Sequence, residues 1–153
     1  MSQIDGNSKT ASSLVRLLPF AVEASWITSR WDKLEEYIRM SESSESGDFN
    51  MRIGSALLSL QHGEPRAIAE AIRDLRLELG KGLTFSSTTS LQSCHDTLLK
   101  LHVLDDVETI LGVLPLDRRE LYTGLNRRLQ VLGGYVSDKQ YVLGLRRAAM
   151  QLW

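Results

Sequence analysis

Apolar residues recur at helical spacing along most of this chain, with charged and small polar residues between them. The pattern is clearest after Pro65, where Ile68, Ile72, Leu75 and Leu79 follow one another at three- and four-residue intervals. Such intervals place side chains on one face of an α-helix, whereas a half-buried strand alternates every second residue. No stretch shows a convincing strand or a two-residue hairpin turn, so the sequence predicts an all-α fold.

The same periodicity, read with helix-end signals, divides the chain into predicted helices. Pro19 and Pro65 stand where helices should begin, and Asp48 and Ser137 are the clearest expected N-caps. Glycines stand where three helices should stop, at positions 63, 80 and 133. We predict helices at residues 19–29, 31–40, 49–62, 65–79, 86–101, 104–114, 117–132 and 138–152.

The predicted turns between paired helices recur at a regular distance. They fall near positions 31, 63, 103 and 134, so the gaps are 32, 40 and 31 residues. A helix–turn–helix unit of roughly 34 residues is the period of tetratricopeptide-type repeats, whose hairpins must stack to bury their apolar faces. Strict repeat residues are not kept between units. The prediction is an α-solenoid of about four TPR-like antiparallel helical hairpins.

Polar stretches set the expected organisation of the chain. Residues 1–10 read as a disordered leader, and residues 11–153 as the helical-repeat segment. Within that segment, residues 41–48 are serine-rich and acidic with no apolar side chain, which predicts an exposed, flexible loop. Residues 80–90 contain two glycines and a Ser/Thr cluster, and form the other expected long connection.

Large aromatic and aliphatic residues on the predicted helices are assigned to packing, because aromatic side chains at helix contacts bury much area. The residues assigned to packing are Ala24, Trp26, Trp31, Leu34, Tyr37, Leu57, Leu60, Ile68, Ile72 and Leu75. The last helix is apolar and lacks the polar outer face that usually finishes a solenoid. We therefore expect an exposed interface there, formed by Leu145, Leu152 and Trp153.

Composition narrows the choice of partners. The net charge is −1, from 18 basic and 19 acidic residues, and gives no electrostatic argument for nucleic acid or a membrane as a direct partner. Cys94 is the single cysteine, so no intramolecular disulfide can form, and a reducing compartment is expected. The polar N-terminus has no secretory h-region, and no apolar stretch approaches the ~18 residues of a membrane span. A soluble intracellular protein is expected.

Candidate chemistry is sparse. Cys94, His95 and Asp96 are consecutive, but neighbours on a helix point about 100° apart, so a nucleophile–base contact among them is not expected. The histidines at 62, 95 and 102 lack the companion spacing of a metal site. Arg127-Arg128 and Arg146-Arg147 favour a solvated face paired with acidic residues over a basic patch. We predict no catalytic, cofactor-binding or metal-binding residue, no cofactor and no small-molecule ligand.

One segment resembles a known family. Residues 23–37 read EASWITSRWDKLEEY, and the pattern E-A-x-W-x-x-x-x-W-D-x-L-E-x-Y is similar to the FAT region of phosphatidylinositol-3-kinase-related protein kinases, most of all the ATR-type DNA-damage checkpoint kinases. Residues 51–60, 125–129 and 143–152 resemble later helices of that region in order and approximate spacing. The resemblance covers roughly residues 18–153, and leaves residues 1–10 and 41–48 without a counterpart.

The resemblance implies a role and no active site. In such serine/threonine kinases the FAT region is a helical scaffold around the kinase domain, and the nucleotide- and metal-binding residues lie in a downstream kinase domain. It implies that this chain is a fragment lacking that domain. It also implies a nuclear location, and protein partners: the remaining repeats and kinase domain of the parent chain, a regulatory subunit or a dimer mate. The alternatives are a free-standing TPR-like adaptor that binds a peptide in its groove, and a small helical enzyme, which would need convergent polar residues.

Overall fold

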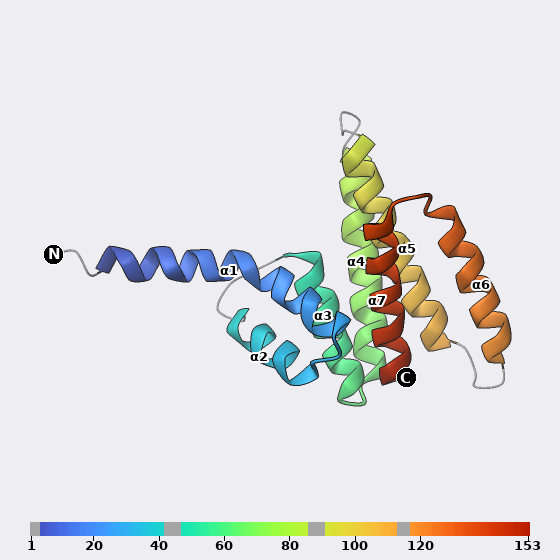
Figure 1. The fold of residues 1–153 in the computed structure, drawn as a ribbon, viewed down its shortest axis with the longest axis horizontal. Helices are drawn as coiled ribbons and strands as arrows, with labels where there is room; N and C mark the ends of the chain where they lie inside the picture. The colour runs from blue at the N-terminus through green and yellow to red at the C-terminus, as the bar shows by residue number, and fades with distance from the viewer. Residues whose placement is uncertain (1–3, 42–46, 86–90, 113–116) are drawn as a thin grey trace.

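The computed structural model describes residues 4–41, 47–85, 91–112 and 117–153. Every regular element in these ranges is an α-helix, and they contain no strand, which confirms the predicted all-α class (Figure 1). The helices are α1 (Ile4–Ile27), α2 (Trp31–Ser41), α3 (Phe49–Gln61), α4 (Pro65–Phe85), α5 (Leu91–Gly112), α6 (Arg118–Val131) and α7 (Val136–Leu152). None of these helices is both long and apolar enough to cross a membrane.

The helices pack as neighbouring hairpins, and the last one returns to the first. Helix α1 packs on α2, α3 on α4, and α4 on α5, as expected for stacked repeats. Helix α7 packs on α5 and also on α1 and α3 (Figure 1). Hydrogen bonds span this junction, from Ser29 Oγ to Gln151 Oε1 at 2.8 Å and from Tyr141 OH to Asn50 Oδ1 at 2.7 Å. Helix α7 therefore closes the array by packing back onto α1 and α3.

Local signals account for the ends of α3 and α6. Asp48 is the N-cap of α3, where its carboxylate accepts hydrogen bonds from the backbone N–H groups of Asn50 and Met51 at 2.8 and 3.3 Å. Gly63 and Gly133 follow α3 and α6 with φ values of +80° and +71°, a backbone conformation that favours glycine. The predictions at these three positions are confirmed.

Two of the predicted helix ends are wrong. Gly80 does not end α4, which continues to Phe85, because a glycine in a helix costs only about 1 kcal/mol relative to alanine and does not force a stop. Ser137 does not cap α7. That helix begins at Val136 with Tyr135 at the N-cap position and no side-chain cap hydrogen bond.

The predicted turn at His102–Val103 is also wrong, because α5 runs unbroken from Leu91 to Gly112. No proline or glycine interrupts residues 91–111, and the residues after the expected turn bury a continuous face: Val103, Leu104, Val107 and Ile110 are all buried. Two predicted helices are therefore one, and the described ranges hold seven helices instead of eight. The rest of those two predictions, residues 86–90 and 113–114, lies outside the described residues.

The expected start of a helix at Pro19 is wrong, because Pro19 lies inside α1. Leu18, Val22 and Trp26 are buried on one face of α1, and this packing carries the helix across the missing proline N–H. The helix begins at Ile4, so the structure places residues 4–10, which the sequence assigned to a disordered leader, in helix. Most of the loop expected at residues 41–48 falls on residues 42–46, outside the described ranges, and it stays a prediction.

The core lies where α1, α3, α4, α5 and α7 meet. Of the residues assigned to packing, Trp26, Leu34, Leu57, Leu60, Ile68, Ile72 and Leu75 are buried, and Trp31 and Tyr37 are partly buried against the core. Ala24 is exposed, because it lies on the opposite face of α1 from Val22 and Trp26. Of the expected interface residues, Leu145 is fully buried because α7 folds back onto α1, α3 and α5; Leu152 is partly buried, and Trp153 is exposed.

Candidate functional site

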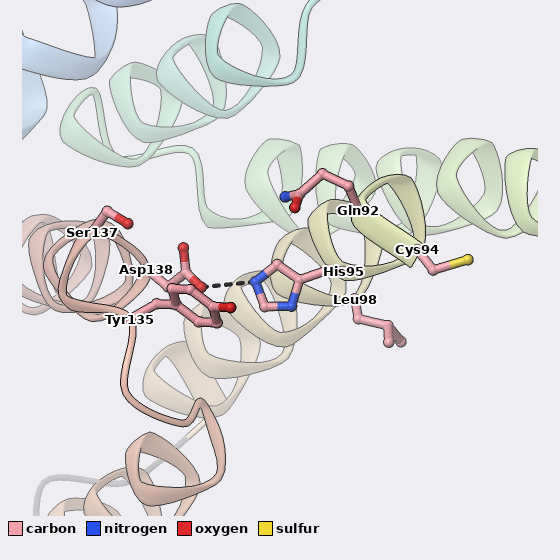
Figure 2. Close-up of a pocket in the computed structure, with 7 residues that line it drawn as sticks. All are labelled: Gln92, Cys94, His95, Leu98, Tyr135, Ser137 and Asp138. Carbon is pink, nitrogen blue, oxygen red and sulfur yellow. Dashed lines mark hydrogen bonds and ion pairs between the residues drawn. The ribbon is translucent and has the colours of Figure 1, made fainter. Parts of the chain in front are cut away.

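An open depression of about 520 Å³ lies where the first turns of α5 and α7 meet (Figure 2). His95 Nε2 of α5 lies 2.8 Å from Asp138 Oδ2 of α7. The ring of Tyr135 meets the imidazole edge-on, with centroids 5.8 Å apart. The described residues that line the depression are Gln92, Cys94, His95, Leu98, Tyr135, Ser137 and Asp138.

This arrangement joins two helices and does not align a nucleophile with a base. Figure 2 shows the Cys94 side chain directed away from His95, as helical geometry predicts for consecutive residues. Asp96 accepts a hydrogen bond from Gln92 Nε2 at 3.0 Å and is not the partner of His95. Ser137 lies beyond Asp138 as seen from the imidazole. The contacts printed for His95 are with the Asp138 carboxylate and the Tyr135 ring, which is the geometry of a contact between two helices.

The histidines do not assemble a metal site. His95 faces Asp138, whereas His102, two turns along α5, lies 3.6 Å from Asp106 Oδ2. Within the described ranges, no group of three or more His, Cys, Asp or Glu side chains could hold a metal ion. His95 therefore serves a contact between helices, and His102 a contact within α5.

A buried ion pair joins α5 to α7. Asp106 is 1% exposed, and it accepts a hydrogen bond from Arg146 Nε at 2.7 Å. Arg128 of α6 reaches the other carboxylate oxygen of Asp106 at 3.1 Å. The predicted solvated face is wrong for Arg146, which is buried, although its acidic partner was expected. Removing one partner of such a buried pair lowers the free energy of unfolding by about 3–5 kcal/mol, because the other charge is left uncompensated.

Neighbouring charges extend this pair into a network across four helices. Arg76 of α4 pairs with Asp105 and Glu108 of α5. Asp105 also lies 2.5 Å from Arg128 Nη1 of α6. These contacts are more exposed than the Asp106–Arg146 pair, so each stabilises the fold by less. Together with the Asp106–Arg146 pair they link α4, α5, α6 and α7.

A second polar network joins α1, α3 and α7 on the other side of the core. Asn50 donates to Glu23 Oε2 at 2.9 Å and accepts from the Tyr141 hydroxyl at 2.7 Å. Burial raises the pKa of Glu23, and the hydrogen bond from Asn50 partly opposes that rise. Burial, with the charge of Glu23 nearby, raises the pKa of Tyr141 above its ordinary range, so its hydroxyl stays protonated at neutral pH. The Tyr141 ring also meets Trp26 edge-on at 6.5 Å.

These contacts have no local signal in the sequence. Asp138, Asn50 and Asp106 lie 43, 27 and 40 residues from His95, Glu23 and Arg146 respectively. Their pairing depends on how α7 returns to the first helices, which spacing along the chain does not encode.

Comparison with protein families identifies this architecture. A family model described as the FAT domain matches residues 18–152. The chain belongs to the FAT domain family. The FAT domain is a helical region of phosphatidylinositol-3-kinase-related kinases, and this chain holds that region without a kinase domain. No solved structure matches the chain significantly.

The residues that carry the family resemblance have structural roles in this FAT domain. Glu23 anchors the polar network to α1, and Trp26 is fully buried beside Tyr141. Trp31 and Tyr37 pack against the core from α2. The match also begins at Leu18, the first described residue of α1 that is buried. The motif at residues 23–37 therefore supplies the contacts by which α1 and α2 join the core.

Proposed function

We propose that this FAT domain is a non-catalytic scaffold segment of a nuclear, ATR-type DNA-damage checkpoint serine/threonine kinase. Its role is to hold the kinase domain in position and to support contacts with a partner subunit or dimer mate. The observation that carries the proposal is the FAT match over residues 18–152. The similarity of residues 23–37 to ATR-type kinases supports the finer assignment.

The packing of the helices suits a scaffold. A segment that positions another domain must resist bending, and an open solenoid bends because each repeat touches only its neighbours. Here α7 ties α5 to α1 and α3 through a buried ion pair and a partly buried hydrogen-bond network. Such ties between helices far apart in sequence oppose bending of the array.

The charge and chemistry of the chain agree with protein partners. The net charge of −1 provides no field for nucleic acid. The Cys94 side chain is directed away from the His95–Asp138 pair, and the described ranges hold no group of three or more side chains that could bind a metal ion. We therefore infer no cofactor and no small-molecule ligand in the role of this domain.

The transcript around the coding sequence tests the assignment first. We expect the reading frame to continue into further helical repeats and then into a kinase domain with ATR-type sequence. A kinase domain of another branch of the family would retain the scaffold role and refute the checkpoint assignment. A stop codon directly after Trp153 and a promoter directly before Met1 would favour the free-standing adaptor.

Binding tests the scaffold role itself. The purified chain is titrated with the kinase-domain portion of the ATR-type kinase from the same organism, and the heat of binding is measured. We expect saturable binding, and no binding to an unrelated protein kinase of similar size. Absence of binding to the ATR-type kinase domain, with the chain shown to be folded by circular dichroism, would contradict the proposal.

A further inference from the structure

Helix α6 lies at the outer edge of the array and packs on α5 through one face (Figure 1). That face carries Leu121, Leu125 and Leu129, which recur every four residues and therefore lie on one side of the helix; we call it the leucine face. Leu125 is buried, whereas Leu121 and Leu129 are only partly buried against the core. A helix that buries so little apolar surface gains little free energy from its packing.

The space between α6 and α5 is incompletely filled. An open hollow of about 290 Å³ lies there, and Thr109 of α5 and Leu121, Gly124 and Leu125 of α6 are among the residues that line it. A Cβ added at Gly124 would meet nothing within 4 Å. Side chains that border a gap lose the dispersion contacts that closely packed neighbours would supply. Helix α6 therefore rests on α5 without the close packing of a core helix.

Arg128 links α6 to α5 through polar contacts. Its Nη1 atom lies 2.5 Å from Asp105 Oδ2 and 3.1 Å from Asp106 Oδ1. The same atom donates to Thr109 Oγ1 at 3.3 Å. Asp106 has a closer partner in Arg146 of α7, which stays in place when Arg128 withdraws. The contacts of Arg128 can therefore break without leaving a buried carboxylate uncompensated.

The connection from α6 to α7 has the features of a hinge. Gly133 has a φ of +71° and is followed by Gly134, and a Cβ added at either glycine would meet nothing within 4 Å. Directly beyond them, Tyr135 and Asp138 both contact His95 of α5, the ring of Tyr135 at 5.8 Å and Asp138 Oδ2 at 2.8 Å. Two unpacked glycines thus separate α6 from a first turn of α7 that is anchored to α5.

We propose that α6 is a latched flap, which detaches from α5 as a unit about Gly133 and Gly134 while α7 stays packed. In the closed state α5 covers the leucine face and the contacts of Arg128 act as the latch. In the open state the leucine face is exposed. A 14-residue helix is only marginally stable by itself in water, so α6 loses its helical hydrogen bonds while it is open. These features belong to the described helices and are independent of the kinase to which the domain is assigned.

Amide hydrogen exchange of the full 153-residue chain, followed by mass spectrometry of its peptides, tests the proposal. After correction for intrinsic rates, the amides of α6 should exchange at least about a hundredfold faster than those of α5 and α7, because opening of the flap is cheaper than global unfolding. Mild urea should accelerate exchange less in α6 than in α7, since the urea dependence scales with the surface exposed. Equal protection of all three helices, lost only with global unfolding, would overturn the proposal.

Arg128→Gln removes the latch and should raise the exchange rate of α6 about threefold, with no change in α7. Arg52→Gln is the matched control, because the Arg52 side chain is 33% exposed, against 38% for Arg128, and pairs with Glu78 between α3 and α4. That control should leave the exchange rate of α6 unchanged. An equal rise in both variants, or no rise with Arg128→Gln, would contradict the proposed latch.

A covalent tether distinguishes detachment of α6 from unfolding of α6 in place. Thr109 Oγ1 and Arg128 Nη1 are 3.3 Å apart. Thr109→Cys with Arg128→Cys, in a Cys94→Ser background, should therefore be joined by a bismaleimide whose reach is about 8 Å, longer than the Cβ–Cβ span of a disulfide. The tether should slow exchange in α6 to within about threefold of that in α5, with the same variant before cross-linking as the control. Exchange that stays fast in the tethered chain would show that α6 unfolds without leaving α5, and would overturn the proposal.

Discussion

Helices α6 and α7 are close in length and adjacent in sequence, but they are held very differently. Helix α7 packs on α1, α3 and α5, and buries Val142, Leu145, Ala148 and Ala149 along one face. Helix α6 packs on α5 and buries one described residue, Leu125. The comparison shows that burial of a complete helix face, not helix length, sets how firmly a helix joins the array.

The polar contacts of α7 are also more buried than those of α6. Helix α7 carries Arg146, which is buried against Asp106, and Tyr141, which is hydrogen-bonded to Asn50. Helix α6 contributes Arg128, which is more than a third exposed. Because water screens exposed charges, the α6 contacts are worth far less than those of α7. Substitutions of the same kind should therefore cost much more in α7 than in α6.

The largest difference should come from the two arginines that share Asp106. Arg146→Ala leaves the buried carboxylate without its close partner and should lower the free energy of unfolding by about 3–5 kcal/mol. Arg128→Ala should lower it by less than about 1 kcal/mol. Urea unfolding of both variants measures the two values. Equal losses would contradict the contrast between the helices.

A double substitution separates charge burial from packing. Asp106→Leu combined with Arg146→Met removes both charges while keeping similar volume. Replacing a buried pair by apolar residues is often neutral or stabilising, so most of the stability lost in Arg146→Ala should return. A double variant as unstable as Arg146→Ala would show that side-chain packing, not the buried charge, accounts for the loss.

Two glycines on α6 and α7 differ in the space around them. A Cβ added at Gly144 of α7 would lie 3.0 Å from Ile27 Cγ1, so Gly144→Val should destabilise the fold by about 1–3 kcal/mol through crowding. A Cβ at Gly124 of α6 meets nothing within 4 Å. Gly124→Ala should therefore stabilise the chain by about 0.5–1 kcal/mol through helix propensity. Thermal unfolding measures the direction of both stability changes. Destabilisation by Gly124→Ala would mean that the surroundings of Gly124 leave no room for a Cβ.

Tyr141→Phe should cost about 1 kcal/mol at neutral pH, because it removes the hydroxyl that donates to Asn50. The pKa of Tyr141 is raised in the folded chain, so its contribution is complete below the ordinary tyrosine pKa near 10 and is lost as the pH rises above it. The stability difference between the two proteins should therefore shrink above about pH 10. A difference that grows with pH would contradict the raised pKa.

The smallest effect is expected at the exposed end of α6. Val131 is 82% exposed, and Val131→Ser should change the free energy of unfolding by no more than about 0.5 kcal/mol. Val142→Ser in α7 is the counterpart, because Val142 is 1% exposed, and it should cost several times more. Urea midpoints compare the two variants directly.

Much of this fold follows from short-range signals. Periodicity predicts the helices. Asp48 correctly marks the start of α3, and the glycines at 63 and 133 correctly mark the ends of α3 and α6. The motif at residues 23–37 indicates the family. The failures came where tertiary packing overrides a local signal. Helix α1 continues through Pro19 because Leu18 and Val22 are buried, and α5 continues past His102 because Val103 and Leu104 are buried.

The candidate site was less predictable than the fold. Consecutive placement drew attention to Cys94, His95 and Asp96, but the carboxylate that His95 meets is Asp138, on another helix. Likewise, no local signal distinguishes Arg146, which is buried, from its exposed neighbour Arg147. These contacts arise because α7 folds back across the first helices, and that return depends on the sum of many apolar contacts.

The return of α7 to α1 is the central claim, and a short chemical cross-link measures it directly. Ser29 Oγ and Gln151 Oε1 are 2.8 Å apart, so Ser29→Cys with Gln151→Cys, in a Cys94→Ser background, should form an intramolecular cross-link with a bismaleimide whose reach is about 8 Å, which spans the two cysteines without the close approach that a disulfide needs. The control pair, Ser29→Cys with Thr123→Cys on the exposed side of α6, should not form one. Peptide mapping that finds the 29–151 link in the folded monomer would support the closed array. No link at 29–151, or equal linking in both pairs, would contradict it.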